Sequence, residues 1–113
     1  MDVRERQMGD VTVVELAGRL TVNDHPGVLR DAVVEAVRRG ARRLLLDLSG
    51  VQYIDSTRLG ELIAAHVTLT RQGGRLRLVG TPARIVELLE IAGLSDVFER
   101  YATTEEAARS FEQ

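Results

Sequence analysis

Hydrophobic residues along this chain change repeatedly between the spacing of strands and the spacing of helices. Val11–Leu16 is rich in β-branched residues, and Leu44–Leu48 is a nearly continuous apolar run, which is typical of a strand covered on both faces. Ser49-Gly50 is predicted to form a turn after that run. Arg75–Val79 alternates polar and apolar residues as strands do. Val97–Tyr101 fits a last short strand at the sheet edge.

Two longer helices are predicted from apolar residues that recur every three or four positions. The first spans residues 26–39, where Asn23 or Asp24 can cap the start and Gly40 suits the end. The second runs from an Asp-Ser-Thr triplet to about Gln72. Their inward-facing positions are expected to be Leu29, Val33, Ala36 and Val37 in the first helix and Leu59, Leu62, Ile63, His66 and Val67 in the second.

Two further helices complete the pattern. One lies between Thr81 and Gly93, and the other covers residues 104–111 with Thr103 or Thr104 as its cap. Strands thus alternate with helices, which implies a layered α/β domain with right-handed parallel crossovers. We expect the whole chain to form one domain with a mixed, mostly parallel central sheet of about four or five strands and helices packed on it.

Composition and charge exclude several functional classes. The chain has 113 residues, enough for one domain with a real core. Its 15 basic and 17 acidic residues are intermixed and give a net charge of −2, whereas a nucleic-acid binder would show a basic stripe. The absence of cysteine excludes disulfides and thiolate metal sites. Without a signal peptide or an apolar stretch of ~20 residues, the expected compartment is the cytoplasm and no membrane contact is expected.

Few residues outside one segment carry recognisable chemistry. The chain contains neither a phosphate-binding P-loop nor a Gly-x-Ser-x-Gly nucleophile motif. Its two histidines, His25 and His66, are far apart in sequence, and His66 is expected to pack at the edge of the core. Arg38-Arg39 and Arg42-Arg43 form a basic cluster, in which the first pair complements a helix end and the second leads into a strand. We therefore expect no enzyme, metal site or cofactor.

The segment Val51–Gly60 is different because a strand-like run ends in Asp55, Ser56 and Thr57 just where a helix begins. Taken alone, these three residues are helix caps of the kind found throughout α/β proteins. A hydroxyl at an exposed helix start can also accept a phosphate, because backbone N–H groups and the helix dipole stabilise the added charge.

The stretch Leu46–Gly60 resembles the signature of the bacterial anti-sigma factor antagonists, a family of STAS domains that typically reads Asp-Ser-Ser/Thr-Gly-Leu-Gly at the matching place. Three more stretches are similar in order and spacing: Ala17–Leu20, Gln72–Leu76 and Pro82–Leu94. The resemblance covers roughly residues 4–111 and implies a STAS-type fold.

The resemblance also implies a partner-switching cycle. In this family the unphosphorylated antagonist binds an anti-sigma factor, typically a serine kinase, and so frees the sigma factor. The kinase then phosphorylates the antagonist, the complex falls apart, and a phosphatase resets the switch. By position the acceptor is Ser56, with Thr57 as the secondary candidate. The implied partner-binding residues are Asp55, Ser56, Thr57 and Arg58, together with Thr21, Asn23 and Asp24.

Two positions depart from the family pattern. Arg58 stands where the family has a glycine, and Thr21 stands where an aspartate is usual. Both are expected near the end of the sheet that faces the kinase. We expect Arg58 to lie beside the acceptor, where its bulk would exclude partners shaped for glycine. Its guanidinium could also pair with Asp55 or with a phosphate on Ser56.

Two other functions stay open from the sequence. The chain could be a constitutive STAS subunit of a larger assembly, such as a stressosome-like or lipid-transport complex, in which Ser56 only caps a helix. It could also be a STAS module that binds a small ligand or a nucleotide.

Overall fold

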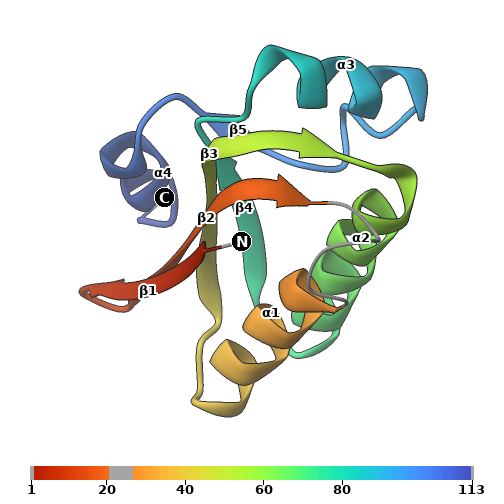
Figure 1. Ribbon diagram of the computed structural model, residues 1–113. Helices are drawn as coiled ribbons and strands as arrows, with labels where there is room; N and C mark the ends of the chain where they lie inside the picture. The colour runs from red at the N-terminus through yellow and green to blue at the C-terminus, as the bar shows by residue number, and fades with distance from the viewer. Residues whose placement is uncertain (1, 21–26, 113) are drawn as a thin grey trace.

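The apolar runs of the sequence form neighbouring strands of one sheet in the computed structural model, which describes residues 2–20 and 27–112 (Figure 1). In chain order the elements are β1 (Asp2–Met8), β2 (Val11–Leu20), α1 (Val28–Arg38), β3 (Arg43–Ile54), α2 (Ser56–Arg71), β4 (Arg75–Val79), α3 (Ala83–Ile91), β5 (Arg100–Tyr101) and α4 (Thr104–Ser110).

The sheet has five strands in the spatial order β1-β2-β3-β4-β5. β1 runs antiparallel to β2, and every other neighbouring pair is parallel. In the register of the central strands, Val13 lies beside Leu45 and Leu45 lies beside Arg77. The predicted mixed, mostly parallel α/β sheet is therefore confirmed.

The helices bury both faces of this sheet. α1 and α2 cover one face, α4 covers part of the other, and α3 lies across one end (Figure 1). Successive strand residues point to opposite faces, so Leu44 and Leu46 enter the larger core under α1 and α2, while Leu45 enters the smaller core under α4. The nearly continuous apolar run of β3 follows from this double burial.

β1 was not predicted, because five of its seven residues are polar and they lack the period of a half-buried strand. Its backbone pairs with β2 from Asp2 opposite Ala17 to Met8 opposite Val11. The two strands are joined through Gly9, whose φ of 61° suits a tight turn. β1 is therefore held in the sheet by its backbone pairing with β2 and not by burial of its own side chains.

The predicted turn at Ser49-Gly50 is wrong, because β3 continues through both residues to Ile54. Gly50 lies beside Ala17 of β2, next to an irregularity in the strand register. A Cβ atom on Gly50 would lie 3.0 Å from the Cβ of Ala17 and 3.2 Å from the carbonyl oxygen of Leu16. The glycine therefore permits close approach of two strands and does not reverse the chain.

One helix start and one strand differ in detail from the sequence pattern. α1 begins at Val28 with Gly27 as its N-cap, while the predicted caps Asn23 and Asp24 lie outside the described residues. β5 covers only two residues, so the predicted last strand is shorter than expected. The hydroxyl of Thr103 accepts a hydrogen bond from the backbone N–H of Glu106 at 3.2 Å, which confirms Thr103 as the cap of α4.

The inward face of α2 also differs at one position. Val67 is 38% exposed rather than buried, and the face continues instead through Ala65 and Leu69. His66 is half-buried, with its ring 5.2 Å from that of Phe98 in an edge-to-face arrangement. The expectation of a packed histidine at the edge of the core is confirmed.

Candidate partner-binding site

The candidate acceptor lies at the junction between the longest strand and the longest described helix. β3 ends at Ile54 and α2 begins at Ser56, so Asp55 is the N-cap between them. One carboxylate oxygen of Asp55, Oδ1, accepts a hydrogen bond from the backbone N–H of Arg58 at 2.9 Å. Asp55 therefore fixes the first turn of α2, and Ser56 and Thr57 occupy that turn.

The side chains of Ser56 and Thr57 are both exposed. Neither hydroxyl makes a hydrogen bond to any other residue that the structure describes. Because Asp55 supplies the cap, the helix start does not need the Ser56 hydroxyl for its own stability. A phosphate on Ser56 would lie at the positive end of the helix dipole, where an anion is tolerated. The serine is thus accessible and available for modification.

Arg58 is buried rather than exposed. Its side chain is only 3% exposed and forms an ion pair with Glu61, one turn further along α2. Glu61 in turn accepts a hydrogen bond through Oε1 from the backbone N–H of Arg30 at the start of α1, at 3.5 Å. Arg58 precedes Leu62 by four residues and therefore lies on the inward face of the helix. The guanidinium is therefore buried in an ion pair with Glu61, and a role for Arg58 in partner binding stays a prediction.

The remaining predicted partner-binding residues, Thr21, Asn23 and Asp24, lie outside the described residues. Leu20, which directly precedes Thr21, pairs with Ile54 at the ends of β2 and β3. The described part of β2 therefore ends beside the end of β3, next to Asp55. A role for the three residues in partner binding stays a prediction.

A groove beside Ser56 was not predicted. It has a volume of about 260 Å³ and lies between the end of β3 and α3. Ile91 on its rim is 83% exposed, more than any other large apolar residue described. Ile91 follows Ile85 by six positions and so falls outside the inward stripe of α3, which is a signal that the sequence already contained. The groove is lined by Tyr53, Ile54, Asp55, Ser56, Arg84, Glu87, Leu88 and Ile91.

This arrangement suits protein binding and phosphate acceptance. An exposed isoleucine beside a groove offers an apolar anchor to a partner, and the neighbouring serine offers a neutral hydroxyl whose charge state can change. Within residues 2–20 and 27–112, no three His, Asp or Glu side chains are grouped closely enough to hold a metal ion. None of the helices in the same ranges is long and apolar enough to cross a membrane.

Comparisons with known proteins point to one family. The family model described as "Mlab, STAS domain" matches residues 3–99. The anti-sigma-B factor antagonist of Bacillus subtilis (strain 168) is 34% identical over 105 residues, which cover 93% of each chain. The protein of the same name from Listeria monocytogenes is 33% identical over 99 residues, 88% of this chain and 85% of that protein.

Solved structures share the fold at lower identity. A Thermotoga maritima protein described as an anti-sigma factor antagonist matches with a TM-score of 0.89 and 22% identity, over 98% of this chain and 95% of that one. SpoIIAA of Bacillus in its phosphorylated form matches with a TM-score of 0.74 and 20% identity, over 97% of this chain and 99% of that one.

Proposed function

This chain belongs to the STAS domain family, and we propose that it is an anti-sigma factor antagonist switched by phosphorylation of Ser56. The observation that carries the proposal is an exposed serine at the start of α2 that its helix does not need as a cap. The identity to antagonists from Bacillus and Listeria over most of both chains supports the same function.

In the proposed cycle, the unphosphorylated protein binds its anti-sigma factor through Ser56 and the neighbouring groove. The anti-sigma factor is a serine kinase, and a phosphatase later removes the phosphate, both in the cytoplasm. Phosphorylation adds about −1.5 to −2 charges at pH 7. Binding would take that charge out of water beside a surface built for a neutral hydroxyl, which weakens the complex. The chain itself acts as a binding protein and catalyses none of these steps.

The experiment begins by recovering the partner. Ser56→Ala protein, which cannot be released by phosphorylation at that position, serves as bait in extract from the source cell. A captured anti-sigma factor is identified, purified and incubated with wild-type protein and ATP. We expect phosphate on Ser56 and dissociation of the complex.

Two variants complete this test. Phosphate should be absent from Ser56→Ala and present on Thr57→Ala, because Thr57 is an equally exposed hydroxyl in the same turn. Phosphate found on another residue of the wild-type chain, or a complex that persists after Ser56 is fully phosphorylated, would contradict the proposed switch.

A further inference from the structure

A second cavity lies at the opposite end of β3 from Ser56. It has a volume of about 280 Å³ and is lined by Arg42, Arg43, Gly73, Arg75 and Phe111. Three of the five lining residues are arginines and none is acidic. This concentration of positive charge occurs in a chain whose net charge is −2, so it is a local feature of this end of the sheet.

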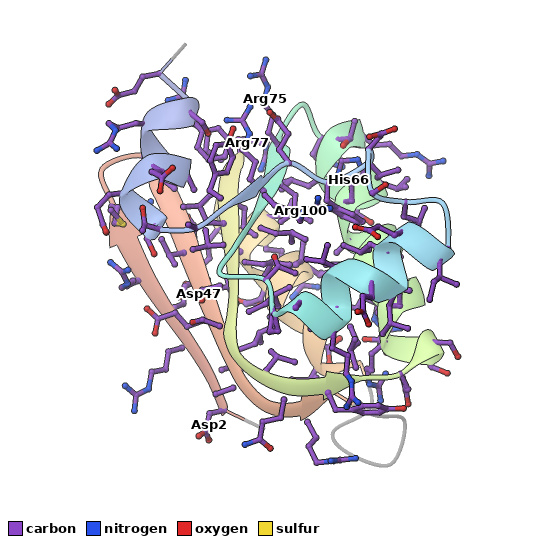
Figure 2. The ribbon with its side chains drawn as sticks, turned by 90° about the horizontal axis from the view of Figure 1, so that it is seen from above. Asp2, Asp47, His66, Arg75, Arg77 and Arg100 are labelled. Carbon is purple, nitrogen blue, oxygen red and sulfur yellow. The ribbon has the colours of Figure 1, made fainter. Side chains whose placement is uncertain are left out.

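The strand register brings two of these charges together. Arg43 of β3 and Arg75 of β4 are direct partners in the parallel pairing. Partners in register project from the same face, and like charges placed opposite one another destabilise the pairing. Arg77, two residues after Arg75, projects from the same face, and Figure 2 shows both side chains on β4 at the side of α4. The fold therefore places three guanidinium groups along two adjacent strands.

The neighbouring acidic residues neutralise only part of this charge. Arg77 is buried and donates to Glu99 at 3.0 Å and to the hydroxyl of Ser110 at 2.6 Å. Arg43 pairs with Asp10 at 2.8 Å, although that carboxylate is 73% exposed. Arg75 makes neither an ion pair nor a side-chain hydrogen bond with any residue in the described ranges. Its guanidinium donors are available to a ligand.

The other walls of the cavity are held in place. The Nη1 atom of Arg42 donates to the carbonyl oxygens of Ala41 at 2.8 Å and Val37 at 3.3 Å. The ring of Phe111 is buried, and the guanidinium of Arg77 lies 4.3 Å from its centroid. Fixed walls reduce the ordering that a ligand must impose on binding, which favours affinity.

We propose that this cavity binds a small phosphorylated anion, with Arg43 and Arg75 as its principal contacts. The planar guanidinium group matches phosphate oxygens in paired hydrogen bonds, so two adjacent arginines suit two linked phosphates. The cavity is slightly smaller than the roughly 300–1,000 Å³ typical of pockets for drug-sized ligands. It therefore fits inorganic pyrophosphate, or the phosphate end of a nucleotide whose remaining atoms lie outside. A bound anion would also relieve the repulsion between Arg43 and Arg75.

The test uses isothermal titration calorimetry with the full chain at constant ionic strength, because exposed charges are screened by salt. Inorganic pyrophosphate is the main probe, with orthophosphate and a nucleoside diphosphate in parallel. We expect saturable binding of pyrophosphate at one site. Arg75→Gln should weaken it about tenfold or more, and Arg75→Lys should weaken it less, because lysine keeps the charge but loses the fork of donors.

Arg4→Gln is the matched control, since it removes the same charge from an exposed position on β1, outside the cavity. Its pyrophosphate affinity should equal that of the wild type. Thermal unfolding provides a second measurement, in which the same pyrophosphate concentration should raise the Tm of wild type and Arg4→Gln by more than that of Arg75→Gln.

The titrations test the site, and they also distinguish free phosphates from a nucleotide as its ligand. Tighter binding of the nucleoside diphosphate than of pyrophosphate would support a nucleotide as the ligand, and equal or weaker binding would support free phosphates. The site would be overturned by the absence of saturable pyrophosphate binding, or by an equal loss of affinity in Arg4→Gln and Arg75→Gln. None of these results depends on whether Ser56 is phosphorylated.

Discussion

Near the start of α2, two residues after the candidate acceptor Ser56, Arg58 forms a largely buried ion pair with Glu61. The side chains of Arg58 and Glu61 are 3% and 16% exposed, and they lie between α2 and the start of α1. Taking two charges out of water is costly, and their pairing offsets part of that cost. Removing Arg58 leaves the largely buried carboxylate of Glu61 without this counterion. A substitution at Arg58 is therefore expected to lower folding stability, and this effect must be measured separately from any effect on the choice of partner.

Arg58→Gly should lower the free energy of unfolding by about 3 kcal/mol or more, because breaking a buried pair typically costs about 3–5 kcal/mol. Urea denaturation provides the measurement. The control is Thr57→Gly, an exposed neighbour in the same turn, which should cost no more than about 1 kcal/mol through helix propensity. Equal losses in the two variants would show that the ion pair contributes little. Arg58→Met combined with Glu61→Leu should recover much of the loss.

Ile91, on the exposed rim of the groove beside Ser56, provides a test of partner binding. Ile91→Ser should weaken binding to the anti-sigma factor about tenfold or more, about 1.4 kcal/mol, because it removes an apolar anchor beside Ser56. Its unfolding free energy should stay within about 0.5 kcal/mol of wild type, since the side chain is 83% exposed. Val34→Ser, an exposed apolar residue on α1, is the control and should bind normally. Unchanged affinity in Ile91→Ser would remove the groove from the proposed interface.

The position of Ser56 at a helix start was predictable, whereas the surroundings of Ser56 were only partly so. The family motif places residues along the chain but does not say which side of the helix each one faces. Arg58 precedes the buried residues Leu62, Ala65 and Leu69 at helical spacing, so its inward direction could have been derived from the pattern. The groove could not, because it depends on how α3 sits against the end of β3.

Among the strands, β3 makes a close approach to β2 at Gly50. Gly50→Ala would place a methyl group 3.0 Å from the Cβ of Ala17, so we expect a loss of about 1–3 kcal/mol in unfolding free energy from overpacking. Gly60→Ala is the matched control within α2, where an added Cβ meets nothing within 4 Å. It should stabilise the protein by up to about 1 kcal/mol through helix propensity. Thermal or urea unfolding of both variants checks the opposite signs, and stabilisation of Gly50→Ala would contradict the close contact.

Elements with strong apolar periodicity were predictable, and those that depend on strand pairing were not. β3, β4 and α2 follow from runs that must be buried. β1 has no such run, although two residues of turn type, Gly9 and Asp10, precede the apolar strand. Ser49-Gly50 has the composition of a turn, yet the approach of β2 to β3 determines its conformation. The residues around Ser49-Gly50 do not by themselves indicate that β2 and β3 come close there.

For the molecule as a whole, β3 joins two cores. Leu44, Leu46 and Leu48 belong to the core under α1 and α2, and Leu45 belongs to the core under α4. Ser56 lies outside both cores, on the exposed surface at the end of this strand. A charge added at Ser56 therefore meets solvent and the helix start rather than packed side chains.

Ser56→Asp should accordingly separate binding from folding. Its Tm should stay within a few degrees of wild type, while its affinity for the anti-sigma factor should fall at least ~100-fold, about 2.7 kcal/mol. Ser56→Ala should melt normally and bind at full strength. Calorimetry and a titration with the purified partner provide the two measurements. A large drop in Tm with Ser56→Asp would mean that the switch acts by unfolding the helix start.

The two outer strands have a consequence for the behaviour of the protein at high concentration. β1 and β5 each pair with one neighbour and so present backbone groups to which a strand of another molecule could add. β1 carries charged side chains at four of its seven positions, and β5 is only two residues long. Charge on one edge and shortness of the other both discourage such addition. Pairing between molecules through either edge of the sheet is therefore disfavoured, which limits this route to aggregation at high concentration.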